Sequence, residues 1–242
     1  MTPFLSIILP AHNEEQRLPQ TLLEIDQFIS EQSWKVEVVI VENGSLDRTL
    51  EIAREYASSH TNVVVIHEDR PGKGLAVKQG MLAASGNYRF FCDVDLSMPI
   101  DQIPRFLPPV LTSVDIAIGS REAKGSIRYN EPFYRHFIGR LFSYVVWFLV
   151  LPGINDTQCG FKCFTAAATQ KLFPLQTVHD WAFDVEILAI AKKMGYKIVE
   201  VPIPWYYSPQ SKVNVLRDLL QTTRDVLKVR KIIRSKAFEE KH

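Results

Sequence analysis

Short apolar runs alternate with helical patterns over the first ninety residues of the chain. The runs rich in β-branched and aromatic residues, which are typical of buried strands, are residues 4–9, 36–41, 62–66 and 88–92. Apolar positions recur with helical spacing between them, over residues 18–25, 50–56 and 76–82. Strands that alternate with helices predict right-handed crossovers and a mostly parallel central sheet with helices on both faces. We therefore expect one α/β domain.

The carboxyl-terminal part of the chain has a different pattern. Helical spacing of apolar residues from Val215 onward runs into five basic residues, which are Lys228, Arg230, Lys231, Arg234 and Lys236. Such charges usually form a solvated face, but a basic end to an amphipathic helix is also attracted to an anionic membrane surface. We expect the α/β domain to occupy residues 1–212 and a membrane-proximal amphipathic helix to occupy residues 213–242.

A second segment, residues 141–151, is apolar almost all round. Pro152 and Gly153 end it well short of the roughly 20 residues that a helix needs to span a bilayer. Two interpretations stay open at this point. The segment is either a buried helix or a helix in the membrane interface, with Tyr144 and Trp147 at the depth of the headgroups.

Composition narrows the classes of protein. The chain has 242 residues, of which 46% are hydrophobic and 23% are charged, so it can bury a substantial core. The net charge of +1 argues against general nucleic-acid binding. Its three cysteines lack a nearby pair of histidines and indicate neither a disulfide framework nor a zinc site. With no basic leader before an apolar stretch at the amino terminus, we expect a cytoplasmic protein.

The strongest chemical signal is Asp93-Val94-Asp95, directly after the apolar run at residues 88–92. Acids at the carboxyl end of a buried strand project into the crevice where open α/β sheets bind ligands. Oxygen ligands favour Mg²⁺ or Mn²⁺, which typically combine one or two carboxylates with phosphate oxygens and water. The alternative is structural, with Asp93 capping a turn and Asp95 a solvated loop acid.

Other short motifs lie at the ends of the predicted strands and further along the chain. In chain order they are Pro10-Ala11-His12-Asn13-Glu14, Glu42-Asn43-Gly44-Ser45, Gly72-Lys73-Gly74, Asp93-Val94-Asp95, Gly119-Ser120-Arg121, Asp156-Thr157-Gln158-Cys159-Gly160-Phe161-Lys162, Phe183-Asp184-Val185-Glu186 and Glu200-Val201-Pro202. Together they resemble the family 2 glycosyltransferases of the GT-A fold over nearly the whole chain. The later motifs resemble the branch that glycosylates polyprenyl phosphates, above all the dolichyl-phosphate glucosyltransferases. One departure is Glu42-Asn43, where many members carry two aspartates.

The resemblance implies an inverting, metal-dependent transfer of a hexose from a nucleotide sugar to a polyprenyl phosphate at the cytoplasmic membrane face. Asp95 is the first choice as a direct ligand of Mg²⁺ or Mn²⁺, with Asp93 in support. The residues expected around the nucleotide are Pro10, Ala11, Asn13, Glu14, Glu42 and Lys73. Glu14 can also be an acid that stabilises the first turn of a helix. Lys73 stands between glycines that allow close approach to phosphate, but the loop lacks the spacing of a Walker motif.

The acceptor side has its own candidates. Cationic and hydroxyl side chains expected to bind the acceptor phosphate are Arg121, Arg135, Ser211 and Lys212. Asp156 is the best candidate for a general base if the acceptor is a sugar hydroxyl, and it can instead cap a turn or orient the acceptor. Asp184 and Glu186 lie at a predicted helix start, where a structural role is as well supported as a catalytic one.

Several functions remain open from the sequence. The motif that begins at Asp156 favours UDP-glucose over GDP-mannose as donor, and a saccharide acceptor is the first rival to polyprenyl phosphate. A sugar-nucleotide pyrophosphorylase would need a glycine-rich loop after the first strand, where this chain has Pro10-Ala11-His12-Asn13-Glu14. A membrane-bound sensor of nucleotide sugars is the non-enzymatic alternative.

Overall fold

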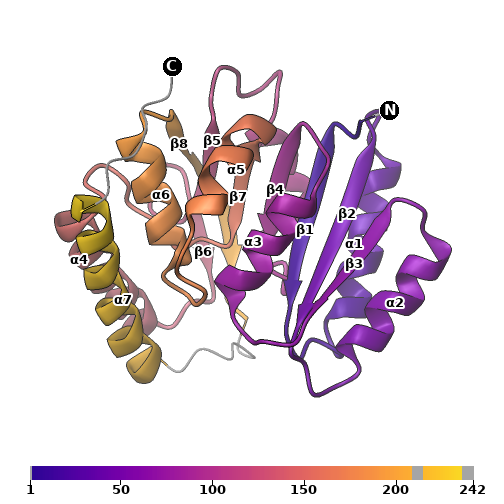
Figure 1. The fold of residues 1–242 in the computed structure, drawn as a ribbon, viewed down its shortest axis with the longest axis horizontal. Coiled ribbons are helices and arrows are strands. Elements are labelled where there is room, and N and C mark those ends of the chain that lie inside the picture. The colour runs from indigo at the N-terminus through magenta and orange to yellow at the C-terminus, as the bar shows by residue number, and fades with distance from the viewer. Residues whose placement is uncertain (1, 209–214, 236–242) are drawn as a thin grey trace.

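The computed structural model describes residues 2–208 and 215–235, and within them seven strands form one central sheet (Figure 1). In spatial order the strands are β3 (Val63–Glu68), β2 (Val36–Asn43), β1 (Leu5–Ala11), β4 (Tyr88–Cys92), β7 (Phe161–Thr165), β5 (Ile116–Ser120) and β8 (Ile198–Pro202). Pairing is parallel except for β7, which runs antiparallel to both β4 and β5. The predicted mostly parallel sheet is confirmed, and the reversed β7 is a feature that the pattern did not predict.

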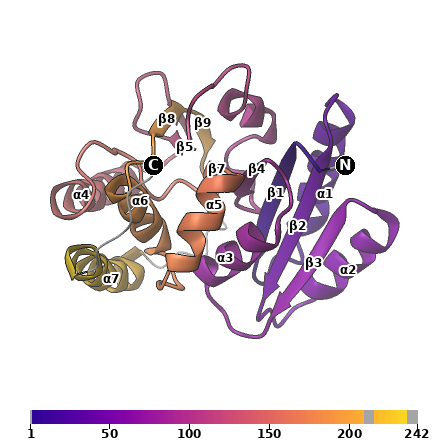
Figure 2. The same ribbon diagram turned by 45° about the horizontal axis from the view of Figure 1, so that its top comes forward.

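Helices cover both faces of the sheet (Figure 2), as predicted. One face packs against α1 (Leu18–Ser30), α2 (Thr49–Ser59) and the 3₁₀ segment η1 (Ile100–Phe106). The other packs against α3 (Lys73–Ala83), α5 (Ala166–Leu172) with the short 3₁₀ segment η2 (Phe173–Leu175), and α6 (Phe183–Lys193). Beyond α6 lie α4 (Phe133–Leu149) and α7 (Val215–Ser235), which contact each other.

The first helix illustrates how the apolar pattern determines which side chains are buried. Leu18, Leu22, Ile25 and Phe28 recur at helical spacing and are buried against the sheet, whereas Leu23 is 63% exposed. Leu23 lies one residue from Leu22, about 100° around a helix of 3.6 residues per turn, and therefore on a different face. The burial of this stripe holds the preceding loop, which carries Glu14, at the carboxyl end of β1.

The apolar segment at residues 141–151 belongs to α4 and the turn after it, and it has two faces. Val146 and Leu151 are fully buried, whereas Trp147 is 42% and Phe148 is 80% exposed. One face of the segment is therefore buried in the core and the other is an exposed apolar surface. Leu151 is part of the buried face and not of the exposed one. Among the helices of residues 2–208 and 215–235, none is both long enough and apolar enough to cross a membrane.

Helix α7 is packed on the main body of the protein. Val226 and Val229 are fully buried in the core cluster that also contains α6. Lys228 is exposed, as are Lys231 and Arg234. The predicted amphipathic character of this segment is confirmed for its described residues. Lys236 and the predicted domain boundary at residue 212 lie outside them.

A small second sheet extends the carboxyl ends of β5 and β8. It pairs β6 (Ile127–Tyr129) with β9 (Pro204–Tyr206) in parallel, so that Arg128 lies opposite Trp205. The rings of Tyr129 and Tyr206 stack with their centroids 4.5 Å apart. Because side chains alternate between the two faces of a strand, Trp205 lies on the opposite face from Tyr206.

Candidate active site

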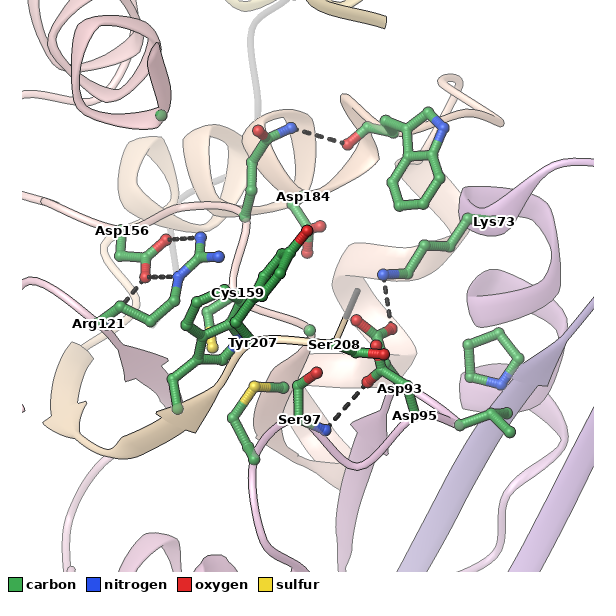
Figure 3. A pocket seen from close by; sticks show the side chains of 18 of the residues that line it. Lys73, Asp93, Asp95, Ser97, Arg121, Asp156, Cys159, Asp184, Tyr207 and Ser208 are labelled. Atoms are coloured by element: carbon green, nitrogen blue, oxygen red, sulfur yellow. Dashed lines mark hydrogen bonds and ion pairs between the residues drawn. The ribbon is translucent and has the colours of Figure 1, made fainter. Parts of the chain in front are cut away.

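The carboxyl ends of β1, β2, β4 and β5 open into one cavity of about 600 Å³ (Figure 3). The order of β3, β2, β1 and β4 reverses at β1, and ligands of open α/β sheets bind at such a reversal, beyond the carboxyl ends of the strands. The predicted site residues that the structure brings together around this cavity are Pro10, Glu14, Lys73, Asp93, Asp95, Arg121 and Asp156.

Hydrogen bonds join the loops after β1 and β2 on one side of this cavity. The backbone N–H of Asn13 donates to Ser45 Oγ (3.0 Å), and the N–H of Leu46 donates to Asn13 Oδ1 (2.7 Å). The N–H of Glu14 donates to Thr49 Oγ1 (2.7 Å), and the side chain of Glu14 forms an ion pair with Arg17. The two loops therefore form one rigid wall, to which Asn13 contributes as a structural link.

Glu42 supports the same wall from behind. It is 1% exposed, its Oε1 accepts a hydrogen bond from the N–H of Ser45 (2.6 Å), and its Oε2 lies 2.5 Å from His67 Nδ1. Ala11 is also fully buried, and neither residue lines the cavity. The structure thus places Glu42 and Ala11 behind the loops that line this side of the cavity, and a direct contact of either with a nucleoside stays a prediction.

The acidic pair after β4 lies on the floor of the cavity. Asp93 Oδ1 is 2.6 Å from Lys73 Nζ, and Asp95 Oδ1 accepts a hydrogen bond from the N–H of Ser97 (3.0 Å). Burial, followed by the charge of Asp93, raises the pKa of Asp95 above its ordinary value. Gly160 allows this packing, because a Cβ atom there would lie 2.0 Å from Asp93 Oδ2.

These residues fit a hard divalent cation that takes some of its oxygen ligands from the protein and the others from a diphosphate. Two carboxylates converge in the cavity, and burial and the charge of Asp93 disfavour the charged form of Asp95, a penalty that an added cation would relieve. Within the described residues, no group of three or more His, Cys, Asp or Glu side chains could hold a metal by itself. Mg²⁺ in particular is usually bound through one or two carboxylates together with substrate phosphates and water.

Asp184 adds a third carboxylate to the same side. It lines the cavity at the first turn of α6, and its Oδ1 lies 2.6 Å from Nζ of the buried Lys162. Burial raises the pKa of Asp184, against the opposing effect of Lys162. Glu186 instead faces the interior and accepts hydrogen bonds from Thr177 and Val178. The geometry thus supports a structural role for Glu186 and a place at the site for Asp184.

Figure 3 shows a second ion pair, Arg121 with Asp156, across the cavity from Lys73 and Asp93. Arg121 Nε and Nη2 lie 2.7 and 2.8 Å from the two carboxylate oxygens, and the N–H of Arg121 also donates to Asp156. Asp156 is 2% exposed. Although burial opposes its charged form, the Arg121 guanidinium holds the pKa of Asp156 below its ordinary value. Both oxygens are therefore engaged, which suits positioning better than proton abstraction.

Three predicted acceptor residues cannot be placed in this site. Arg135 lies in α4, and Ser211 and Lys212 lie outside the described residues. Their proposed contact with the acceptor phosphate stays a prediction.

Some residues that line the cavity were not predicted as site residues from the sequence. The aromatic side chains among them are Trp181, Trp205 and Tyr207. Arg128 also lines the cavity and forms ion pairs with Glu122 and Glu131. A signal was available, because the aromatic run at residues 205–207 begins three residues after Pro202, the last residue of the motif Glu200-Val201-Pro202.

An open α/β sheet with paired acids at a strand end, beside a cavity of this size, is typical of an enzyme that binds its ligand beyond the carboxyl ends of the strands. The model of the family described as glycosyl transferase family 2 matches residues 6–173. The chain belongs to this family and is a glycosyltransferase with the GT-A fold.

Individual relatives agree with this assignment. The dolichyl-phosphate beta-glucosyltransferase of Drosophila melanogaster is 36% identical over 241 residues, which cover 93% of this chain and 74% of the relative. The human enzyme of the same name is 32% identical over 246 residues, covering 95% and 75%. Glucosyl-3-phosphoglycerate synthase from Mycobacterium tuberculosis, solved with Mn²⁺, UDP and its product, has a TM-score of 0.69 at 20% identity, covering 96% of this chain and 80% of that one. This likeness shows the fold.

Proposed function

We propose that this enzyme transfers glucose from UDP-glucose to a polyprenyl phosphate such as dolichyl phosphate, with inversion and with a divalent metal, at the cytoplasmic face of a membrane. The observation that carries the proposal is that one cavity holds both an acidic pair suited to a metal-bound diphosphate and a guanidinium suited to a phosphate. The names of the relatives support glucose and dolichyl phosphate. The neighbour solved with UDP and Mn²⁺ supports the donor and the metal.

On the donor side, Asp95 and Asp93 would hold Mg²⁺ or Mn²⁺, which as a Lewis acid stabilises charge on a departing diphosphate. Lys73 contacts Asp93 at the start of α3, and the charges of Asp93 and Asp184 raise its pKa despite the opposing effect of burial. We therefore assign Lys73, as a permanent cation, to a diphosphate oxygen. Pro10 and Glu14 line the same cavity and are assigned to the nucleoside.

On the acceptor side, the nucleophile needs little help from a base. A phosphate monoester has a second pKa near ~6 and is mostly a dianion at neutral pH. Asp156 is held by Arg121 and is a weak base because its pKa is lowered. We assign Asp156 to orient Arg121, and Arg121 to bind the acceptor phosphate through its planar fork. A direct displacement by this phosphate inverts the anomeric carbon without a covalent enzyme intermediate.

A screen of donors against a short-chain polyprenyl phosphate tests the proposal. UDP-glucose is expected to give more glycosylated polyprenyl phosphate than UDP-galactose or GDP-mannose. With a free saccharide as acceptor, no glycosylated product is expected. Transfer from GDP-mannose in preference to UDP-glucose, or transfer to a sugar hydroxyl in place of the lipid phosphate, would contradict it.

The exposed face of α4 supports a position at the membrane surface. Phe133 is 82% and Phe148 is 80% exposed, and Ile138 and Ser143 of the same helix line the cavity. An acceptor with its chain in the bilayer must present its phosphate to this cavity, so the adjacent apolar face is well placed to enter the interface. Helix α7, whose exposed basic residues attract anionic lipid, lies beside α4 (Figures 1 and 2).

We expect the protein to float with anionic liposomes at low salt, and Phe148→Ser and Trp147→Ser to reduce the bound fraction at any salt concentration. Each basic residue near an anionic surface contributes about 1 kcal/mol. Replacing Lys228, Lys231 and Arg234 with glutamine should therefore reduce the salt-sensitive part of binding. Val110→Ser is the matched control, because Val110 is 68% exposed and belongs to the segment between η1 and β5, not to either helix. Equal flotation of all variants would reject the membrane role of these two helices.

A further inference from the structure

The indole of Trp205 lies beside two guanidinium groups at the acceptor side of the cavity. Arg121 Cζ is 5.6 Å and Arg128 Cζ is 5.8 Å from the centroid of its ring. Both distances fall within the roughly 6 Å over which the face of an aromatic ring attracts a cation, and tryptophan is the most effective ring for this contact. All three side chains line the cavity.

The small sheet of β6 and β9 determines this arrangement. Arg128 and Trp205 are direct cross-strand partners, and the N–H of Tyr207 donates to the carbonyl of Tyr129 (3.0 Å) to fix the register. Tyr206 stacks on Tyr129 and does not line the cavity. The sheet therefore separates a pair of tyrosines on one face from Arg128 and Trp205 at the cavity.

Carboxylates hold the edges of both guanidinium groups. Arg121 uses Nε and Nη2 to contact Asp156. Arg128 Nη1 lies 2.7 Å from a carboxylate oxygen of Glu131, and its Nη2 contacts Glu122. The side chains of Glu122 and Glu131 are only 9% and 11% exposed, so these partners are fixed by packing. Because carboxylates hold the edges of the two guanidinium groups, the indole can act on their orientation through its ring face.

We propose that Trp205 is a positioning residue that orients Arg121 and Arg128 toward the acceptor phosphate, and that Arg128 is a second ligand of this phosphate. The inference rests on the proposed function. Each guanidinium has five N–H donors, and the ion pairs use only part of them. Two planar forks held against one ring match the several acceptor oxygens of a phosphate monoester.

Kinetics with a varied concentration of short-chain polyprenyl phosphate test this role. Trp205→Leu removes both ring contacts, and we expect the KM for the lipid phosphate to rise about tenfold. The KM for UDP-glucose, and the affinity for UDP measured by calorimetry, should change less than twofold. Trp205→Phe retains an aromatic face and should recover most of the acceptor affinity. Arg128→Gln should raise the acceptor KM in the same selective way.

Tyr206→Leu is the matched control, because it removes a ring from the same strand without altering the cavity. If Trp205→Leu and Tyr206→Leu raise both KM values alike, Trp205 only stabilises the small sheet and the inference is wrong. If the wild type transfers glucose to polyprenyl phosphate but Trp205→Leu leaves the acceptor KM unchanged, the inference is rejected and the proposed function stands. A wild-type enzyme that transfers to a sugar hydroxyl instead rejects the proposed function, and the inference with it.

Discussion

Asp95→Asn is expected to lower kcat/KM at least about a thousandfold, because a metal acting as a Lewis acid contributes several kcal/mol and each ~1.4 kcal/mol is a factor of ten. The substitution preserves the shape of the side chain and its contact with the N–H of Ser97 but removes a charged ligand. Calorimetry of UDP binding with and without Mn²⁺ gives a second readout. The wild type should bind UDP more tightly with Mn²⁺, and the variant should lose most of that difference.

The fold should tolerate this change. Burial and the charge of Asp93 both disfavour an ionised Asp95, so a neutral amide removes a repulsion without losing an ion pair. We therefore expect an unchanged or slightly higher Tm. Asp101→Asn serves as the control, because Asp101 is exposed on η1 and does not line the cavity. Turnover like that of the wild type in Asp95→Asn would rule out Asp95 as a metal ligand.

The sequence was sufficient to predict the amino-terminal half of the fold and that several of its polar loops would meet at one edge of the sheet. Each strand from β1 to β4 is short, apolar and followed by a polar loop, and parallel pairing then brings those loops to one edge. For this reason the sequence pattern alone groups Pro10, Lys73, Asp93 and Asp95, and the structure places all four around one cavity.

The side of the cavity around Arg121 was harder to predict because its contacts are not periodic. The reversed direction of β7 could not be predicted, because an apolar run does not indicate whether the strand pairs in parallel or antiparallel. Trp205 and Arg128 meet through a pairing of two three-residue strands separated by a long stretch of chain. Glu42 shows a related difficulty, because the sequence alone does not reveal that its two carboxylate oxygens contact a histidine and a backbone N–H.

The second large effect is expected on stability and catalysis when the ion pair of Arg121 and Asp156 is broken. Asp156→Asn should lower the free energy of unfolding by about 2 kcal/mol at neutral pH, since it leaves the Arg121 guanidinium, whose side chain is 24% exposed at the cavity, without its charged partner. Catalysis should fall as well, through weaker binding of the lipid phosphate. Because we assign Asp156 to hold Arg121, raising the pH should not restore kcat. Recovery of kcat at high pH with an unchanged acceptor KM would identify Asp156 as a general base instead.

The stability difference should also depend on pH in a defined direction. The pKa of Asp156 is lowered in the folded protein, so its contribution is fully present above the unfolded-state pKa of about 3.9 and is lost as the pH falls toward the folded value. Urea unfolding from pH 7 down to pH 3 should show a constant gap between wild type and Asp156→Asn at the upper end and a shrinking gap below about pH 4. Asp101→Asn, which alters an exposed acid, should show little gap at any pH. A gap that widens as the pH falls would mean that Arg121 does not stabilise the charged form of Asp156, and the assignment of Asp156 as the residue that orients Arg121 would fail with it.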